Sequence, residues 1–218
     1  MPRERIIQAA VELVDTGGVE ALTFRALAER LGSGTATLYR HMADRAELVS
    51  EVVDHILGEV DLTAGAGHHE DWQTAVAALC DELFAVLARH QRATPLFAEH
   101  VPTGPHAMAF REACLAVMLK AGLAPTTAAA SAATLGRYTL GFAMQMHATS
   151  DDSQNVSAVF ERADTRQYPT IQALAGHLPV PLEAEFAYGV RMMIRGVAAT
   201  SEHTTPQPQD GARHGLSL

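Results

Sequence analysis

The 218-residue sequence predicts an all-α fold, and two observations lead to that prediction. Apolar side chains recur every three or four residues through most of the chain, which is the period of an amphipathic helix. No stretch of useful length alternates apolar and polar residues, as a half-buried strand would. Apolar residue types make up 48% of the chain, which is enough for a sizeable core. We expect a small N-terminal domain and a larger C-terminal helical domain, without an internal repeat.

The first predicted helix covers Arg3–Asp15. Its apolar side is formed by Ile6, Ala9, Ala10, Leu13 and Val14. Gly17 and Gly18 end this helix, because glycine adopts the left-handed backbone of a helix C-terminus without a steric cost. The next helix follows Thr23, whose hydroxyl can accept a hydrogen bond from a free N–H group of the first turn.

Residues 27–48 predict two short helices joined by a tight turn and the start of a longer one. Gly32 ends the helix that begins after Thr23, and the turn continues to Gly34. The helix after the turn, Thr35–His41, has Leu38 on one side and small or polar residues on the other. Short helices separated by a turn of about four residues match a helix-turn-helix.

A helix of the length of Thr35–His41 fits the major groove of DNA. At about 1.5 Å per residue it spans about 10 Å, and the groove is about 12 Å wide. The expected base contacts come from Thr35, Ala36, Thr37 and Arg40. Tyr39 and His41 are expected to reach phosphates, and Arg25 and Arg45, which flank the helix in sequence, can add charge contacts. A Tyr-Arg-His run can also be an ordinary solvated helix face. The length of the turn and the large apolar segment that follows favour DNA binding.

The N-terminal segment resembles the DNA-binding domain of the TetR family of bacterial transcription repressors. The matching stretches are RERIIQAAVELVDTGG, LTFRALAERLG and TATLYRHMADRAEL. GRYTLGF at residues 136–142 and FAYGVRMMIRGV at residues 186–197 are similar to the regulatory domain of the tetracycline-repressor branch. The resemblance implies base-facing groups at Arg25, Thr35, Ala36, Thr37 and Arg40, and phosphate contacts at Thr23, Tyr39, His41 and Arg45. Gly34 stands where the family frequently has serine, and glycine is also an acceptable helix cap.

The net charge of −9 opposes broad, nonspecific binding to nucleic acid. Even residues 1–50 contain six arginines against seven acidic residues. Three of those arginines, Arg25, Arg40 and Arg45, flank the predicted groove helix. Local potential governs DNA binding more than total charge does, so the objection is not decisive.

Further helices are predicted along the rest of the chain. A D-x-x-E capping box at Asp44 begins a helix that runs to Asp61. We expect a hinge at Thr63–Gly67 and a polar loop with at most a short helix at Thr149–Tyr168. The other predicted helices are Asp71–His90, Pro95–Glu99, Pro105–Ala121, Pro125–Ala148, Ile171–Leu178 and Pro181–Thr200. We expect a DNA-binding domain over 1–46, a connecting helix over 47–62, a regulatory and dimerisation domain over 63–200 and a disordered tail over 201–218.

The predicted helices Pro125–Ala148 and Pro181–Thr200 are rich in small and apolar residues. An apolar stripe along a helix packs within one chain more often than between chains. The resemblance, however, implies that these two helices pair with their copies in a homodimer. The residues expected at that interface are Leu135, Thr139, Phe186, Val190, Met193, Ile194 and Val197. A dimer also follows from the DNA-binding prediction, because one short helix makes few contacts. Two copies would read a palindromic operator with half-sites about 34–36 Å, or a multiple, apart.

A regulatory domain needs a cavity for a small-molecule effector. The candidate lining residues are Phe84, Leu87, Phe97, His100, Met108, Arg111, Leu115, Met118, Phe142 and Gln145. Arg111 and His100 are the more informative ones, since a buried charge needs a partner. Alternatively, both lie on the surface at a helix end or loop.

The resemblance also argues against one effector. Tetracycline repressors bind a magnesium–drug chelate through a histidine, a partner-subunit glutamate and an asparagine. Their positions here hold Phe97, Gln145 and, nearby, Leu79. We therefore expect a more apolar effector than magnesium–tetracycline, and no cofactor or bound metal. The run His68-His69-Glu70-Asp71 is interpreted as a solvated helix start, where acidic residues are favoured.

The sequence lacks the motifs of the common enzyme classes. The sequence has no phosphate-binding loop, dinucleotide fingerprint, zinc-protease motif or nucleophile elbow, so we expect no enzyme. Cys80 and Cys114 are expected to be buried free thiols. No run of eighteen apolar residues predicts a membrane span, and we expect a cytoplasmic protein. The alternative to a DNA-binding regulator is an all-α carrier or enzyme.

Overall fold

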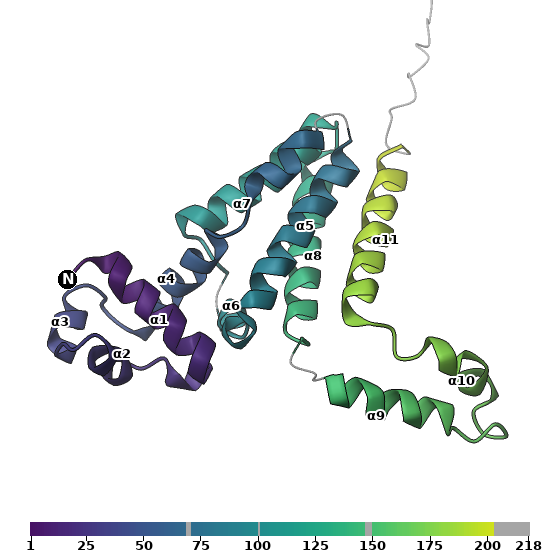
Figure 1. The fold of residues 1–218 in the computed structure, drawn as a ribbon. Helices are drawn as coiled ribbons and strands as arrows, with labels where there is room; N and C mark the ends of the chain where they lie inside the picture. Colours follow the sequence, from purple (N-terminus) through teal and green to yellow (C-terminus); the bar gives the residue numbers. More distant parts are fainter. Residues whose placement is uncertain (69–70, 100, 147–149, 203–218) are drawn as a thin grey trace, which may run out of the picture.

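The computed structural model describes residues 1–68, 71–99, 101–146 and 150–202. Within these ranges the chain forms helices and turns and contains no strand, which confirms the predicted all-α fold. A three-helix unit lies at one end of the molecule (Figure 1). The larger helical domain follows it, and α4 connects the two.

The N-terminal unit contains α1 (Arg3–Gly17), α2 (Phe24–Arg30) and α3 (Thr35–Tyr39). Helix α1 buries Ile6 and Val14 completely. It ends at Gly17, because Gly18 adopts a φ of 77°, which favours glycine. Thr23 caps α2 as predicted, since its Oγ1 accepts a hydrogen bond of 3.1 Å from the Ala26 N–H.

Helix α3 is two residues shorter than the predicted Thr35–His41. The N–H groups of His41 and Met42 both donate to the Leu38 carbonyl, at 2.8 and 3.0 Å. The backbone therefore tightens into a turn at this point instead of continuing as an α-helix. Met42 is 1% exposed and enters the core, so the end of α3 is anchored by packing.

Helix α4 (Arg45–Leu57) begins at the predicted capping box. The Asp44 carboxylate accepts from the Glu47 N–H at 2.9 Å, and Glu47 accepts from the Ala43 N–H at 2.6 Å. The helix ends at Leu57, four residues before the predicted Asp61, because the chain turns at Gly58. The predicted hinge Thr63–Gly67 falls in a 3₁₀ segment, Leu62–His68, that packs on α5.

The larger domain is arranged around α5 (Trp72–Arg89), which packs against three other long helices. These are α7 (Pro105–Lys120), α8 (Pro125–Ala143) and α11 (Leu182–Glu202). The short α6 (Leu96–Glu99) lies between α5 and α7 in sequence and contacts α4. Helix α8 ends five residues before the predicted Ala148, and residues 147–149 lie outside the described ranges.

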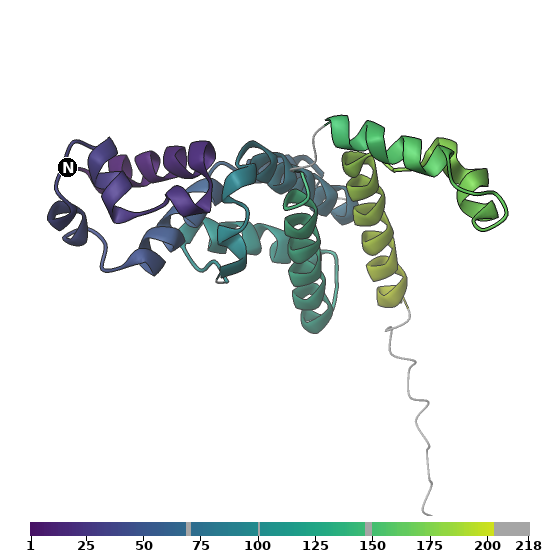
Figure 2. The ribbon, with the colours of Figure 1, turned by 90° about the horizontal axis from the view of Figure 1, so that it is seen from below.

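The prediction of a loop with at most a short helix at Thr149–Tyr168 is wrong. Residues Ser150–Glu161 form the twelve-residue α9, which packs with α10 (Pro169–Leu174) and the turn after it. Val156, Val159 and Phe160 have helical spacing, but the polar residues around them obscure the pattern. The two helices form an arm that projects from the domain (Figures 1 and 2). The predicted disordered tail, 201–218, lies outside the described residues from 203 onward.

Candidate nucleic-acid interface and effector groove

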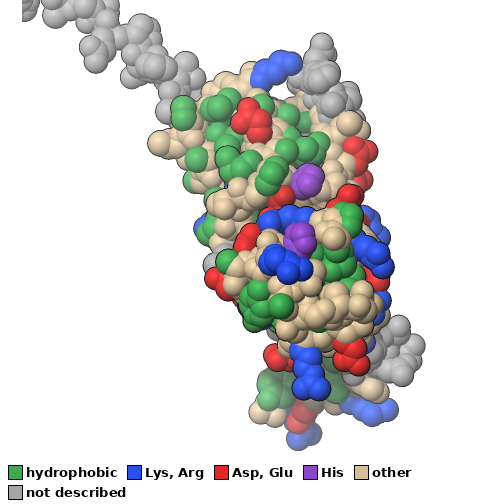
Figure 3. Space-filling model, turned by 90° about the vertical axis from the view of Figure 1, so that its left-hand side faces the viewer, with side chains coloured by type: hydrophobic (Ala, Val, Ile, Leu, Met, Phe, Trp, Pro, Cys, Tyr) green, Lys and Arg blue, Asp and Glu red, His purple; other side chains and the backbone are tan. Residues whose placement is uncertain are grey.

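Helix α3 forms an outer edge of the molecule and is anchored by one side chain. Leu38 is fully buried in the hydrophobic core and α3 packs on α2, while Thr35 and Ala36 are exposed. Figure 3 shows this end of the molecule, where basic side chains and histidines stand among uncharged and acidic ones. A short helix fixed from behind and exposed in front can enter a DNA groove without unfolding its support.

The side chains around α3 are positioned by specific contacts. The Tyr39 ring stacks on Phe24 of α2, with centroids 4.4 Å apart and an angle of 3° between the planes. Arg40 Nη2 donates to Thr37 Oγ1 at 3.1 Å. Tyr39 is 56% exposed, so its hydroxyl can reach a phosphate while its ring remains stacked. The stack makes Tyr39 a rigid part of the surface.

All nine predicted DNA-contacting residues reach the surface. Seven are exposed, namely Thr23, Arg25, Thr35, Ala36, Tyr39, Arg40 and Arg45, and two are half-buried, Thr37 and His41. The Thr23 hydroxyl accepts the capping hydrogen bond and keeps its own proton free to donate to a phosphate. Arg45 differs from the others, because it forms an ion pair of 2.9 Å with Glu99 of α6.

Arg3 holds the α3 end in place, and sequence reasoning did not find it. Its Nη1 donates to the His41 carbonyl at 2.8 Å, and its Nη2 pairs with Glu47 and Glu51 at 2.7 and 2.9 Å. These hydrogen bonds, to Glu51 first and then Glu47, raise the pKa of Arg3. The long sequence separation between these partners explains why no local pattern revealed the clamp.

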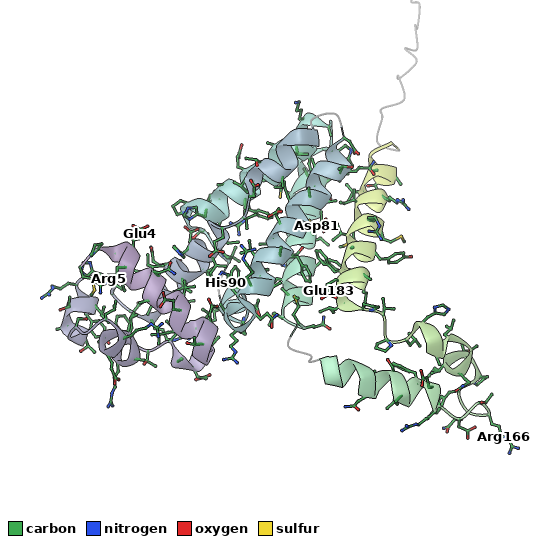
Figure 4. The ribbon with its side chains drawn as sticks, in the orientation of Figure 1. Glu4, Arg5, Asp81, His90, Arg166 and Glu183 are labelled. Carbon is green, nitrogen blue, oxygen red and sulfur yellow. The ribbon has the colours of Figure 1, made fainter. Side chains whose placement is uncertain are left out.

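A second set of contacts joins the N-terminal unit to the larger domain. His90, labelled in Figure 4, is buried at the end of α5. Its Nδ1 lies 2.9 Å from Asp15 of α1 and its Nε2 lies 3.1 Å from Glu59 after α4. Arg92 also donates to the Thr16 carbonyl. His90 and Arg92 therefore join α1, the end of α5 and the segment after α4.

Asp54 connects α4 to α7. Its buried carboxylate accepts from the N–H groups of His106 and Ala107, at 3.3 and 3.0 Å, and lies 3.0 Å from His106 Nδ1. A carboxylate at the N-terminus of α7 satisfies N–H groups that have no partner within the helix. A Cβ at Gly104 would collide with this carboxyl group, which explains why glycine occupies the position.

An apolar groove of about 580 Å³ lies within the larger domain. It is lined by Leu57, Leu83, Leu87, Phe97, Ala98, Glu99, Val101, Pro102, Ala107, Phe110, Arg111, Ala132, Ala133, Gly136, Arg137 and Leu140. These residues come from α4, α5, α6, α7, α8 and the loop after α6. A second hollow of about 480 Å³ beside α1 has walls of mainly polar and charged residues, among them Glu4 and Arg5 (Figure 4), and suits an apolar ligand less well.

Three of the predicted effector residues, Leu87, Phe97 and Arg111, line the apolar groove. Six others do not: Phe84, Met108, Leu115, Met118, Phe142 and Gln145. The tenth, His100, lies outside the described residues.

Packing explains where those six side chains lie. Phe84 stacks on Phe186 of α11 with centroids 4.2 Å apart, and Phe142 packs on Tyr138. Met118 is fully buried beside a small cavity, and Leu115 packs against the core. The other two are exposed: Met108 points outward, and Gln145 donates to the Gly141 carbonyl.

The α8 wall of the groove was missed because it consists mainly of small residues. Ala132, Ala133 and Gly136 line a cavity by leaving space, which is not a property that marks them in a sequence. Arg137 could have marked this wall in the sequence, since it is a single charge within an otherwise uncharged helix.

The predicted dimer residues mostly pack within the chain. Leu135, Thr139, Phe186, Val190 and Ile194 are buried, and Met193 and Val197 are half-buried. Helix α11 packs on α5 and α8, and Phe186 stacks on Phe84 of α5. The outer face of α11 instead carries Tyr188 and Met192, which are 59% and 51% exposed.

The cysteines are buried and free, as predicted. Burial raises the pKa of each thiol to about 12, so neither is a reactive thiolate.

In the described part of the chain, no three His, Cys, Asp or Glu side chains are grouped to hold a metal ion. Asp71 caps α5, whereas His69 and Glu70 of the predicted solvated run are outside that part. None of the helices described has the length and apolarity to cross a membrane.

Comparison with known proteins identifies similar sequences for both domains. Residues 6–52 match the family of bacterial regulatory proteins, tetR family, and residues 65–201 match the tetracyclin repressor-like C-terminal domain. An HTH-type transcriptional regulator of Saccharopolyspora erythraea is 32% identical over 208 residues, covering 92% of this chain and 86% of that protein.

Solved structures show the same fold. Apo ActR from Streptomyces coelicolor has a TM-score of 0.85 and 25% identity, covering 94% of this chain and 98% of that chain. ActR in complex with actinorhodin has a TM-score of 0.81 and 24% identity, covering 92% and 98%.

Proposed function

Since the chain belongs to the TetR family of bacterial transcription regulators, we propose that it is a homodimeric repressor which binds a palindromic operator and is released by a small, mainly apolar effector. The observation that carries the proposal is α3, a helix anchored by one buried leucine, with an exposed front. Beside it lie two arginines, Arg25 and Arg40, that pair with no carboxylate among the described residues. A helix with this exposure and these charges suits the major groove.

A homodimer is supported by the size of the reading helix and by uncovered apolar surface. One five-residue helix contacts too few base pairs to select a site, whereas two copies on a two-fold axis double the contacts. Tyr188 and Met192 on the outer face of α11 supply a surface that a second copy could cover.

The apolar groove supports a small-molecule effector. Its walls are mainly aliphatic and aromatic, and its volume of about 580 Å³ suits a ligand of a few fused rings. The structure of ActR in complex with actinorhodin supports an effector site, since a protein with this fold binds a small molecule.

Three contacts connect the groove to α4 and offer a route for release. Leu57 of α4 lines the groove directly, and Glu99 of its wall pairs with Arg45 at the start of α4. Asp54 of α4 caps α7, the helix that carries Arg111. A ligand that separates these walls would tilt α4 and change the spacing of the two reading helices. Coupling of about 1–3 kcal/mol would weaken operator binding roughly 5–150-fold.

Selection of bound DNA from a random pool tests the proposal. We expect enrichment of a palindrome whose half-sites lie about 34–36 Å, or a multiple, apart. Thr35→Asp, which places a negative charge at the front of α3, should abolish enrichment, whereas Arg166→Ala at the tip of the arm should not (Figure 4). If the wild-type protein enriches no DNA sequence, the proposal is contradicted and an all-α carrier or enzyme is favoured.

A further inference from the structure

We infer that the effector is an apolar molecule with an acidic group, and that Arg111 and Arg137 bind that group inside the groove. The inference rests on the proposed function, because it names the class of ligand for the same groove. Both arginines line it, Arg111 from α7 and Arg137 from the facing helix α8.

The charge balance of the groove is positive. Glu99 is the one acidic residue among its lining residues, and it already pairs with Arg45 at 2.9 Å. The other lining residues, apart from the two arginines, are uncharged. An uncharged effector would therefore leave the half-buried Arg111 guanidinium beside apolar walls without a counterion, whereas the exposed Arg137 keeps its water.

Neither arginine has a carboxylate within ion-pair distance in the part of the chain that the structure describes. Arg111 donates through Nη1 to the carbonyls of Pro102 and Ala107, and Arg137 donates to the Ala133 carbonyl at 3.4 Å. A guanidinium has five N–H donors in a planar fork, so Arg111 retains Nε and Nη2 for a ligand. That fork matches the two oxygens of an acidic group.

The contrast with other arginines makes this arrangement informative. Acidic residues exceed basic ones by nine in this chain, and Arg3, Arg30, Arg45 and Arg89 each pair with a glutamate. Among the described residues, Arg111 and Arg137 lack such a partner, as do Arg25 and Arg40 beside α3, and they differ from these by lining an apolar groove. A purely structural Arg111, which only fixes the Pro102 loop, does not explain why a second unpaired arginine lies at the same groove.

Two probes with the same aromatic skeleton test the inference. Anilinonaphthalene sulfonate carries one negative charge, whereas N-phenylnaphthylamine is neutral, and both become fluorescent in apolar sites. Fluorescence titration of the full chain should show at least about tenfold tighter binding of the anion, because a charge-assisted contact replaces water at a guanidinium. The double variant Arg111→Gln/Arg137→Gln should lose that preference and bind the neutral probe within about twofold of wild type.

Two further variants fix where the probes bind. Gly136 lines the groove, and a side chain added there meets open space. Gly136→Leu should therefore fill the groove and weaken both probes at least about tenfold. Arg166→Gln removes one positive charge at the arm tip and should change neither titration.

The outcomes separate this inference from the proposed function. Equal affinity of the two probes for wild type, unchanged sulfonate binding in the double variant, or failure of both probes to bind overturns the acidic effector. Selection of a palindrome from the random DNA pool is a separate measurement, and it tests the proposed function independently of the probe titrations.

Discussion

At the residue scale, Tyr39 and Arg40 should affect DNA binding in different ways. Removing a phosphate contact weakens binding to all sequences, whereas removing a base contact also changes which sequence is preferred. We expect Tyr39→Phe to weaken all operators by about fivefold to tenfold, the equivalent of one lost hydrogen bond. It keeps the stack on Phe24, so α3 should remain in place. Arg40→Ala should cost about 1–3 kcal/mol and relax preference at one base pair.

Fluorescence anisotropy against the selected operator and single-base variants measures both effects. Tyr39→Ala serves as the comparison, because it removes the hydroxyl and the stacked ring together. If Tyr39→Phe binds as wild type does while Tyr39→Ala fails, the role of Tyr39 is to support α3 through Phe24 and not to contact phosphate.

The Glu59 carboxylate gives the domain junction a pH dependence. Burial raises its pKa, but hydrogen bonds from Arg89 and His90 outweigh burial and lower the pKa below the ordinary 4.5. A carboxylate with a lowered folded-state pKa stabilises the protein above the unfolded-state value and loses that contribution as pH falls through the folded value. We therefore expect the wild-type free energy of unfolding to fall more steeply than that of Glu59→Gln as the pH drops below the ordinary glutamate pKa of 4.5.

Urea unfolding at a series of pH values measures that slope. Glu20→Gln is the matched control, since Glu20 is exposed and makes no ion pair in the described part of the chain. Identical slopes for wild type and Glu59→Gln would contradict a stabilising role for the junction carboxylate.

At the element scale, the Glu99–Arg45 pair places α6 against the start of α4. Arg45 can pair with Glu99 or with a phosphate, but its guanidinium cannot satisfy both fully. Glu99→Gln should therefore strengthen operator binding by up to about fivefold, the size expected when one exposed ion pair is removed. The salt dependence of binding should steepen by about 0.9 in log–log slope if one more phosphate contact forms.

Anisotropy titrations across salt concentrations measure the two quantities together. Glu112→Gln on α7 is the control, because it removes an exposed acid outside the groove lining. Weaker operator binding by Glu99→Gln would show that the pair supports the DNA-binding geometry instead of competing with it.

The elements that the sequence predicted well are those whose information is local. Thr23 and Asp44 mark helix starts, because capping depends on one side chain and the next three residues. The arm helix α9 was missed because its apolar positions are few, and the groove wall around Gly136 because it is defined by missing side chains. The Arg3 clamp joins residues more than 35 positions apart, which no local spacing predicts. The groove required the assembled fold, although Leu87, Phe97 and Arg111 could be chosen in advance.

At the scale of the whole molecule, two of the exposed apolar surfaces in the described part of the chain lie far from the DNA-binding end. The first is the outer face of α11, with Tyr188 and Met192 one helical turn apart. The second is the projecting arm, where Val159, Tyr168 and Leu174 are exposed. Both lie on the side of the molecule away from α3 (Figure 1). Association through this side would leave the two reading helices free to face the same DNA.

The double variant Tyr188→Asp/Met192→Asp should therefore convert the proposed dimer into a monomer. Two carboxylates in an apolar interface lose hydration without gaining a partner, which disfavours association far more than it affects an exposed helix face. Analytical ultracentrifugation should report the monomer mass, and operator affinity should fall by at least about 100-fold, because each half-site then binds alone. Leu119→Asp on α7 is the matched control, since it adds a charge at another exposed apolar residue and should leave both measurements unchanged. A double variant that remains dimeric and still binds the palindrome would place the interface elsewhere, with the arm as the next surface to alter.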